Sequence, residues 1–473
     1  MSSYARTLLL TFISFLYSLF IFSTSTLAID PPSFTILSEV EPTGVDFNNT
    51  QEERITEITP WALENKTKTG GNHLFLVSSN KTFLCDFPDN IFGSIFTSTV
   101  SSCKLRQGST INRQTVNNTY DTTLPLWRRD FYGAFSGHIV VTDSGTLIYA
   151  INHGELLNND YFMPLGQPCY PTPDIGYGTL PCDGQPEDVS YNAFVTMSTF
   201  NFGRDFFSQT PFTDLGPVVW PANGYVDAGK KATYLGILHP SSIIKDGYLY
   251  VFFRDTSLGQ DSEGRGPGPK VARAPITSTG VDPKSFKTYY DGAFTDSALP
   301  QGFDKNNIMN YFNKKGGRSS SLFARDYSPK YITNTYSFAV AKIKNKPGYL
   351  GVSNDLIKGL SFRFSLDLVN WSDDTVLPQG GAAVTSGPFL YARLAGSNGD
   401  SSSEIDPQDF YVIGTQNHIV NKMHLKLNNL PTFSGDLNAD GKVNIYDYVK
   451  LLNGFNVIYF ADDFAALVLN YGK

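Results

Sequence analysis

Pairs of β-rich runs joined by a glycine-bearing turn recur along this chain and constrain its fold more than any other feature. The clearest pair occupies residues 137–141 and 146–149 and turns at Ser144-Gly145, and a second pair turns at Asp246-Gly247. Asp-Gly and Ser-Gly between such runs indicate β-hairpins because these residues tolerate positive φ. Units that open with a hairpin begin near residues 72, 137, 239, 336 and 389.

These units are of broadly similar size, which predicts a radial repeat, a five-bladed β-propeller over residues 70–430. Because their spacing is irregular, a large β-sandwich with irregular loops is the alternative. Aromatic residues make up 14% of the chain, with 41 Gly and 27 Pro, a composition that favours short strands and tight turns. No long helical periodicity precedes residue 440, so we predict a mostly β fold.

The N-terminus has the pattern of an export signal. Arg6 supplies a positive charge, residues 8–22 form an apolar run, and Thr26-Leu27-Ala28 offers small residues for cleavage. A single membrane anchor is the alternative, although the run is short for a spanning helix. We expect a signal peptide over residues 1–28 and a polar, irregular lead-in over residues 29–69. The mature chain would be secreted, extracellular or attached to the cell surface, without a membrane span.

Export makes the cysteines of this chain interpretable. Cys85 and Cys103 are close in sequence, as are Cys169 and Cys182, so two local disulfides are the simplest of the three possible pairings. Four reduced, buried thiols are the alternative. The chain contains no Cys-x-x-Cys pair of the kind that binds zinc.

Residues 436–447 match an EF-hand-type calcium loop along their whole length. Oxygen donors fall at loop positions 1, 3, 5, 9 and 12, Gly441 stands where the chain must turn sharply, and the carbonyl of residue 442 would serve position 7. A hard cation needs about six or seven oxygens, and this segment supplies them. A polar turn rich in Asp and Asn is the alternative. The predicted ligands of Ca²⁺ are Asp436, Asn438, Asp440, Lys442, Asn444 and Asp447.

Residues 448–453 follow this loop with the pattern of an amphipathic helix, and residues 463–470 repeat that pattern. The arrangement resembles the duplicated half of a dockerin over residues 435–473, within a small α-helical, dockerin-like module at 431–473. Residues 456–462 are too few for a second calcium loop, so we predict one calcium ion. The resemblance implies docking onto a cohesin module of a scaffold, and a calcium-stabilised cap without a partner is the alternative. The residues expected near the docking surface are Ile445, Tyr446, Val449 and Lys450.

A Ser-x-Asp-Leu-x-x-Trp element lies at residues 365–371. It resembles the element that closes a blade in the five-bladed propeller glycosidases, the superfamily of arabinanases, β-xylosidases and invertases. Residues 213–219 resemble the segment that follows such an element, and residues 239–250 are similar to a blade-opening hairpin of those enzymes. The resemblance spans roughly residues 125–415 and implies a glycoside hydrolase acting on O-glycosyl bonds.

Enzymes of that superfamily cleave with paired carboxyl groups that project from inner strands of different blades. The Asp that normally precedes Pro in their blade-opening strand is His239 here, which leaves the usual general base unassigned. Our catalytic candidates are carboxylates near inner strands, namely Glu155, Asp255 and Asp130, with Asp326 and Glu404 as weaker alternatives. The candidates for substrate binding are His138, His153, His239, Arg254 and Trp127. Solvated carboxylates and strand-end polar side chains are the alternatives.

Three functions fit these patterns. The first is hydrolysis of a polysaccharide or oligosaccharide, because dockerins usually append to such enzymes. The second is a non-catalytic carbohydrate-binding propeller, supported by the histidine at position 239. The third is a cell-surface structural or adhesion protein. The net charge of −7 gives the chain no basic surplus, which argues against a nucleic-acid partner.

Overall fold

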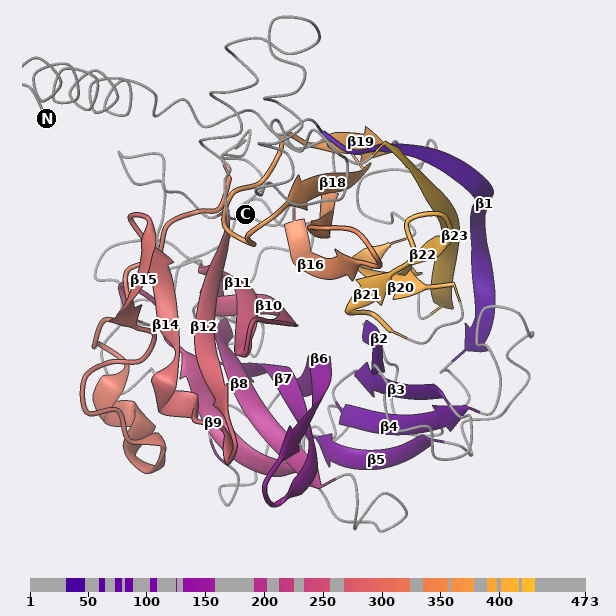
Figure 1. Cartoon of the computed structure of the whole chain (residues 1–473). Helices are drawn as coiled ribbons and strands as arrows, with labels where there is room; N and C mark the ends of the chain where they lie inside the picture. The colour runs from indigo at the N-terminus through magenta and orange to yellow at the C-terminus, as the bar shows by residue number, and fades with distance from the viewer. Residues whose placement is uncertain are drawn as a thin grey trace, which may run out of the picture.

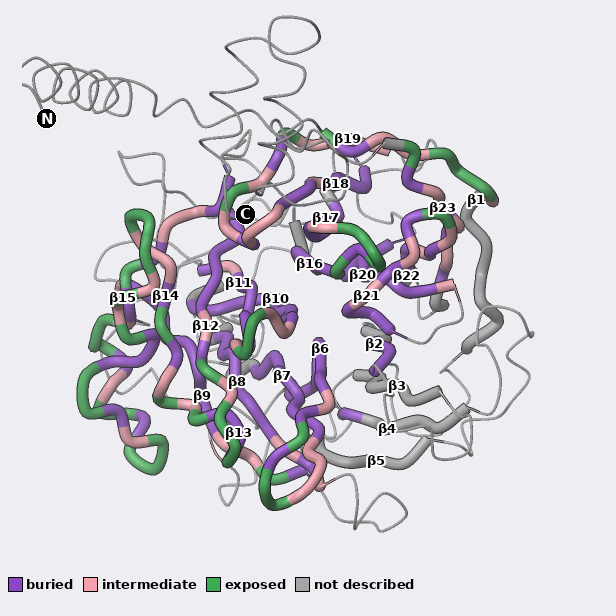
Figure 2. Tube along the Cα trace, viewed as in Figure 1, coloured by how far each residue is buried: buried purple, intermediate pink, exposed green. Residues whose placement is uncertain are grey.

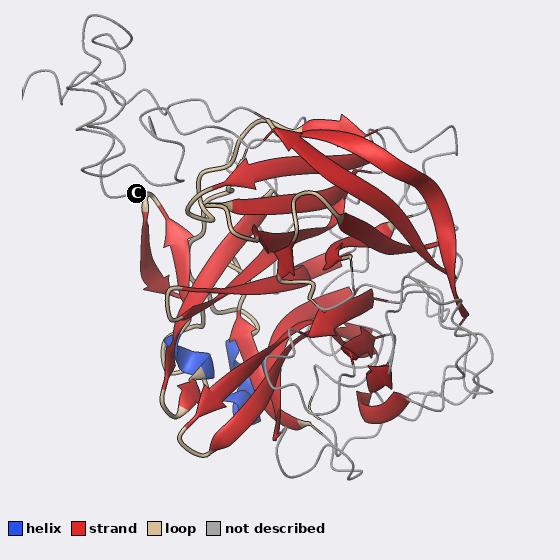
Figure 3. Cartoon of the chain, turned by 45° about the vertical axis from the view of Figure 1, so that its right-hand side comes forward, coloured by secondary structure: helices blue, strands red, loops and turns tan. Residues whose placement is uncertain are grey.

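The computed structural model describes residues 31–46, 59–63, 73–78, 81–87, 103–108, 125, 131–157, 191–201, 212–224, 234–255, 268–323, 335–355, 359–377, 389–397, 401–416 and 419–429. The described part consists mainly of strands, with two short 3-10 helices, η6 (Pro283–Ser285) and η7 (Lys305–Tyr311) (Figure 3). The mostly β prediction is therefore confirmed. No helix in these ranges is long and apolar enough to cross a membrane. The predicted signal peptide, Cys169, Cys182 and the dockerin-like module with its calcium loop lie outside the described residues.

The strands form five antiparallel units, which we call sheets I to V. Sheet I contains β2 (Thr59–Leu63), β3 (His73–Ser78), β4 (Lys81–Phe87) and β5 (Cys103–Gly108). Sheet II contains β6 (Phe131–Thr142), β7 (Gly145–Leu157), β8 (Tyr191–Asn201) and β9 (Thr213–Val219). Sheet III contains β10 (Tyr234–Lys245), β11 (Tyr248–Asp255), β12 (Pro269–Thr277), β13 (Gly280–Val281), β14 (Lys287–Tyr290) and β15 (Ala293–Ser297). A short parallel pairing of β10 with β8 joins sheets II and III.

Sheets IV and V complete the arrangement. Sheet IV contains β16 (Thr335–Ile343), β17 (Tyr349–Asp355), β18 (Gly359–Ser365) and β19 (Thr375–Leu377). Sheet V contains β20 (Leu390–Gly396), β22 (Phe410–Gln416), β23 (Ile419–Asn429) and β1 (Ser33–Asp46). The two-residue strand β21 (Glu404–Ile405) follows β20 in the chain but pairs parallel with β16, so it links sheet V to sheet IV.

The inner strands of the five sheets, β2, β6, β10, β16 and β20, face a common centre (Figure 1). Successive inner strands contact one another in that order, and β20 also contacts β2. Hydrogen bonds accompany these contacts. The indole Nε1 of Trp61 on β2 donates to the carbonyl of Gly137 on β6, and the amide of Ala62 donates to Ser402 Oγ, just after β20. Ser241 Oγ on β10 donates to the carbonyl of Phe338 on β16.

The N-terminal strand β1 pairs antiparallel with β23 and forms the outer edge of sheet V (Figure 1). Residues 29–69 were expected to be an irregular lead-in, and β1 and β2 correct that expectation. Their signal in the sequence is weak for a physical reason. An edge strand buries little surface, so Ile36 and Leu37 remain 43% and 47% exposed, and Pro42 is tolerated where one side of the strand needs no partner.

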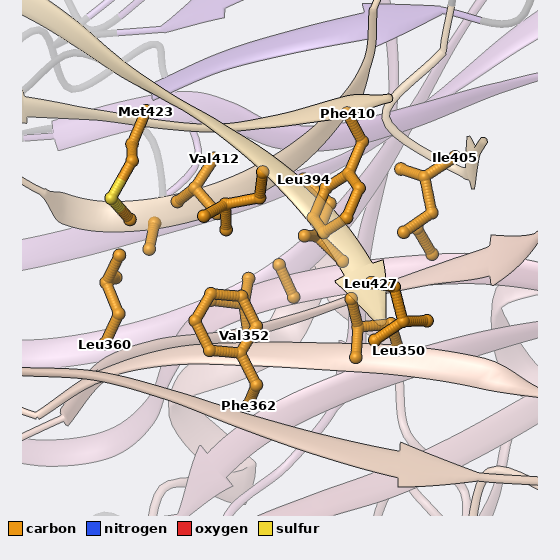
Figure 4. Close-up of a cluster of buried hydrophobic side chains, with 14 of the residues drawn as sticks. Leu350, Val352, Leu360, Phe362, Leu394, Ile405, Phe410, Val412, Met423 and Leu427 are labelled. Atoms are coloured by element: carbon orange, nitrogen blue, oxygen red, sulfur yellow. The ribbon is translucent and has the colours of Figure 1, made fainter. Parts of the chain in front are cut away.

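Hydrophobic cores lie between neighbouring sheets, and the inner strands are mostly buried (Figure 2). The core between sheets IV and V shows the pattern (Figure 4). Leu350 and Phe362 project from one sheet and meet Val412 and Leu394 of the other, with Ile405 of β21 beside them. Alternate residues of each strand enter such a core, which explains why the sequence signal is a set of short apolar runs instead of a helical period.

The predicted hairpins are present. β10 and β11 are joined through Asp246 and Gly247, with Lys245 opposite Tyr248 in the register. Both turn residues have positive φ, 49° and 75°, as a two-residue turn of type I′ requires. β6 and β7 are also joined by a two-residue turn, but it consists of Asp143 and Ser144, one residue before the predicted Ser144-Gly145. Neither turn residue has positive φ, whereas Gly145, the first residue of β7, has a φ of 130°. The hairpin near residue 72 is formed by β3 and β4, the second and third strands of sheet I, because β2 precedes them.

The Ser-x-Asp-Leu-x-x-Trp element closes the end of β18 through its own hydrogen bonds. Ser365 Oγ accepts from the amide of Leu368 at 2.9 Å, and Asp367 Oδ1 accepts from the amide of Asn370 at 2.8 Å. This loop aims Trp371 at Phe338 of sheet IV and at Phe252 of sheet III, with ring centroids 4.8 Å and 6.3 Å from that of Trp371. The element therefore has a structural role at a sheet end, where it packs sheet IV against sheet III.

Cys85 and Cys103 occupy directly opposite positions on β4 and β5. Opposite residues of an antiparallel pair have Cα atoms about 4.5–5.5 Å apart, which is within the range that a disulfide spans. The backbone register thus places the two residues as the predicted pairing requires, and the bond itself stays a prediction.

Candidate functional site

Four of the five inner strands carry an extra residue at a similar place. The register shifts lie between Ala134 and Ser136 on β6, Leu238 and Ser241 on β10, Thr335 and Phe338 on β16, and Leu390 and Arg393 on β20. Such β-bulges redirect side chains and are frequent next to functional sites. Here they lie on strands that face the common centre.

His239 and Tyr391 lie within two of these bulges, in the left-handed region of φ. Their φ angles are 49° and 55°. Non-glycine residues adopt this region at a cost, which is larger for a bulky aromatic residue than for histidine. The surrounding packing must hold both residues in place. A backbone that is strained in this way, on strands facing the centre, is a reason to look there for function.

Rings from three sheets meet beside these bulges, and we call Phe135, His153, His239, Tyr391 and Arg393 the central cluster. The ring centroids of Phe135 and His153 are 5.1 Å apart, and those of His153 and His239 are 5.5 Å apart, at interplanar angles of 29° and 18°. Tyr391 meets both ends of this stack edge-on, 5.3 Å from Phe135 and 5.3 Å from His239. The sequence prediction named His153 and His239 separately, and the structure brings them together.

A hydrogen bond fixes the relation of the two histidines. The backbone N–H of His239 donates to Nδ1 of His153 at 3.2 Å. This Nδ1 must therefore be unprotonated, which leaves a proton on Nε2 in the neutral ring. The bond joins β10 to β7 and holds the bulged residue in position.

Within the described residues, the groups that act electrostatically on His239 are basic. Burial lowers the pKa of His239 well below its usual value, and interactions with His153, Arg254 and Arg393 lower it further. The ring is therefore neutral at pH 7 and can exchange hydrogen bonds, but it carries no charge. It offers no carboxyl group of the kind that glycoside hydrolysis uses.

His138, a second predicted binding residue, belongs to a different network. Its Nε2 lies 2.9 Å from Ser242 Oγ, which in turn lies 2.7 Å from Ser136 Oγ, and its Nδ1 lies 3.4 Å from Ser403 Oγ. The ring is 6% exposed, and burial lowers its pKa to about 4. These bonds connect sheets II and III to the segment between β20 and β21, and the edge-on contact with Trp61 adds sheet I. The contacts are those of a buried histidine that holds sheets together.

Arg254 and Asp255 end β11 and, as adjacent strand residues, point to opposite faces of sheet III. Arg254 acts electrostatically on His239. Asp255 is 1% exposed, and its Oδ2 accepts a hydrogen bond from the amide of Ala222 at 2.8 Å. Its described contact is therefore with the segment after β9, and a role in holding that segment is the simplest account of it.

The other catalytic candidates are only partly placed. The backbone of Glu155 lies two residues beyond His153 on β7, opposite Phe131 and Ala193 in the register. Glu404 is paired with Lys342 at 3.9 Å, and both side chains are partly exposed. Asp130, Asp326 and Trp127 lie outside the described residues.

Sequence reasoning missed Phe135, Tyr391 and Arg393. Tyr391 and Arg393 stand at the start of the unit that begins near residue 389. His239 and Ser241 stand at the start of the unit that begins near residue 239. Aligning the starts of the units would have pointed to them. Phe135 lies two residues before the predicted hairpin of its unit, which begins at residue 137, so the same alignment would not have included it.

Several solved structures share similarity with the chain over most of its length. One is the catalytic domain of a family 62 α-L-arabinofuranosidase from Coprinopsis cinerea, with a TM-score of 0.41, 11% identity, 85% of this chain covered and 99% of that chain. A second is an α-L-arabinofuranosidase from Podospora anserina in complex with cellotriose, with a TM-score of 0.39, 11% identity, and 83% and 96% covered. A third is a family 117 glycoside hydrolase from Zobellia galactanivorans, with a TM-score of 0.36, 11% identity, and 85% and 91% covered.

At these TM-scores and identities, the similarity carries no inference about the activity of this chain. No protein-family model matches the sequence, and no curated relative matches it. Within the described ranges, no group of three or more His, Cys, Asp or Glu side chains is arranged to hold a metal ion.

Proposed function

We propose that this chain is a secreted carbohydrate-active protein whose sheets form a closed five-bladed β-propeller, with a sugar-binding site at the central cluster. The observation that carries the proposal is the meeting of Phe135, His239 and Tyr391 through bulges on three inner strands. Sugar sites combine aromatic rings with a few fixed polar groups, and the stack of Phe135, His153 and His239 offers both. The ring of contacts among the inner strands supports the closed arrangement.

Glycoside hydrolysis is the activity that we propose for this site. It needs one carboxyl group to protonate the leaving oxygen and another to activate water or attack the sugar carbon. Glu155 is the leading candidate, because its backbone lies two residues from His153 on the strand that carries part of the cluster. Asp255 and Asp130 remain the candidates for the second carboxyl group.

A non-catalytic carbohydrate-binding propeller, or an adhesion protein of the cell surface, is the second candidate. The neutral state of His239 favours it, because this residue stands where the resembling enzymes carry a charged Asp. A site of rings and hydrogen-bond donors that lacks a pair of carboxyl groups binds sugars without cleaving them.

The C-terminal module belongs to the same proposal. We assign one Ca²⁺ to the loop that begins at Asp436, and attachment through the module to a cohesin-bearing scaffold. Such attachment would hold the propeller beside the polysaccharide on which it acts.

A hydrolysis screen on the secreted chain tests the activity. Arabinan, xylan, fructan and galactan oligosaccharides would be incubated with the wild type, Glu155→Gln, Asp255→Asn and Asp246→Asn. Loss of a catalytic carboxyl group is expected to lower turnover about 10²- to 10⁴-fold while sugar binding persists. Asp246→Asn is the matched control, because this carboxylate is exposed in a hairpin turn, where it pairs with Lys245.

The result separates the two candidates. Turnover that survives in both Glu155→Gln and Asp255→Asn would reject this catalytic assignment. Glycan-array binding without turnover in the wild type would identify the binding protein instead, and silence in both assays would favour adhesion.

A further inference from the structure

Arg393 is a buried cation in the central cluster. It follows the bulge that contains Tyr391, and its side chain is fully enclosed. Nη1 donates to the carbonyl of Ala392 at 3.1 Å, and Nη2 donates to the carbonyl of Pro240 at 3.4 Å. Nε is buried and has no hydrogen-bond acceptor. Within the described part of the chain, no carboxylate forms an ion pair with it.

Such a charge is unfavourable unless it is compensated. Burying an ionised group without a partner costs several kcal/mol, so buried charges in proteins are normally paired. Burial lowers the pKa of Arg393 to about 9, so the guanidinium still carries its charge at pH 7. The face of Phe135, 5.7 Å from the guanidinium carbon, offsets only part of the cost.

Arg254 is a second cation close to the cluster, because both guanidinium groups lower the pKa of His239. A buried guanidinium is compensated most fully by an anion. A neutral sugar hydroxyl could accept the hydrogen bond of Nε, but it would leave the charge uncompensated.

Arg363 provides a contrast within the same fold. It is also largely buried and stacks on Phe323 at 4.2 Å, but its Nη2 lies 3.4 Å from Oδ1 of Asp374. Its Nη1 donates to the carbonyl of Ser372 at 2.6 Å. The protein thus supplies a carboxylate to one buried arginine and none, within the described ranges, to the other.

We propose that Arg393 binds an oxyanion between β10 and β20, either the carboxylate of an acidic sugar residue or an inorganic phosphate. The guanidinium would supply a charge-assisted hydrogen bond from Nε, and the bulge at Tyr391 places it at the centre. The sugar source rests on the proposed carbohydrate function, while the phosphate source does not.

The test uses the full chain and thermal unfolding together with calorimetric titration. The probes are sodium D-glucuronate, D-glucose, sodium phosphate, and sodium chloride at matched ionic strength. Glucuronate and glucose differ at one carbon, a carboxylate against a hydroxymethyl group, so their difference isolates the charge. We expect an oxyanion to raise the Tm of the wild type and glucose to leave it unchanged.

Two substitutions locate the effect. Arg393→Met, which keeps the volume and removes the charge, should weaken binding of the oxyanion about 10- to 100-fold. Arg363→Met is the matched control and should keep the wild-type response. Arg393→Lys keeps the charge without the planar guanidinium, and an intermediate response from it would show that charge and geometry both contribute.

Each outcome decides something. A response to glucuronate alone identifies an acidic sugar, a response to phosphate alone identifies the inorganic ion, and either supports the site. No response beyond that of chloride in the wild type, or a response unchanged in folded Arg393→Met, overturns it. If neutral oligosaccharides bind but no anion does, the proposed sugar-binding function stands and the anion site at Arg393 is rejected. If an anion binds but no sugar does, the anion site stands and the sugar-binding function is rejected.

Discussion

The backbone N–H of His239 donates to Nδ1 of His153 at 3.2 Å, and the two rings stack with their centroids 5.5 Å apart. One histidine thus fixes the backbone of the other at a left-handed position within a bulge. Because β7 and β10 belong to different sheets, this contact couples the geometry of the centre to the packing of sheets II and III.

Replacing His153 tests that coupling. His153→Phe keeps a ring in the stack but leaves the amide of His239 without this acceptor, so we expect a loss of about 1–2 kcal/mol of unfolding free energy. Urea unfolding at pH 7 measures it. The matched control is His424→Phe, which keeps the stack on Tyr411 and removes a partly exposed contact with Asp409. If the two variants lose the same unfolding free energy, the hydrogen bond from the amide of His239 contributes no more to stability than a partly exposed contact.

Acid should destabilise the fold through His138. Its pKa is about 4 in the folded chain against an ordinary 6.5, so the unfolded chain takes up a proton more readily. Stability is therefore fully present above pH 6.5 and is lost as the pH falls toward 4, by on the order of 3 kcal/mol.

Denaturant unfolding at pH 7, 5.5 and 4.5 measures this slope, with His138→Gln as the variant. Glutamine can still reach Ser242 but does not titrate, so the variant should be less stable at pH 7 and lose less stability on acidification. Met309→Gln, at a position 42% exposed, adds the same amide and should keep the wild-type slope. A slope that His138→Gln leaves unchanged would assign the acid sensitivity to other groups.

A disulfide between Cys85 and Cys103 is the next expectation. The register places the two residues opposite each other on β4 and β5, and export would expose the chain to oxidising conditions. Peptide mass mapping of the secreted chain without reduction should recover the two cysteines in one linked fragment. If alkylation under denaturing conditions modified both thiols without prior reduction, the pairing would be wrong.

Local signals made much of this fold predictable. The turn at Asp246-Gly247 is determined by two residues that tolerate positive φ, and the strands on either side carry their own apolar runs. β1 could not be predicted in the same way, because its partner β23 lies about 400 residues further along the chain and its exposed edge needs few apolar residues. Strand pairing over such a distance leaves no local pattern.

The centre was only partly predictable. Histidine is uncommon in this chain, so His153 and His239 drew attention, but nothing in the sequence showed that they stack. Arg393 stands among ordinary strand residues, and its burial goes with its place directly after a bulge on an inner strand. Bulges arise from pairing between strands, so they are visible only once the register is known.

The calcium loop supplies the final prediction. Calcium-depleted full-length chain should bind one Ca²⁺ with measurable heat and gain helical signal in circular dichroism, because oxygen donors at the loop positions of Asp436 and Asp440 are those that a hard cation requires. Asp436→Ala and Asp440→Ala should each abolish most of the heat. Asp462→Asn removes a charge from the same module outside the loop and should bind normally. The proposed attachment to cohesin depends on a module that is ordered by calcium. If the chain binds no Ca²⁺, that partner has no support, whereas the proposal for the central cluster is unaffected because the cluster contains no residue of the loop.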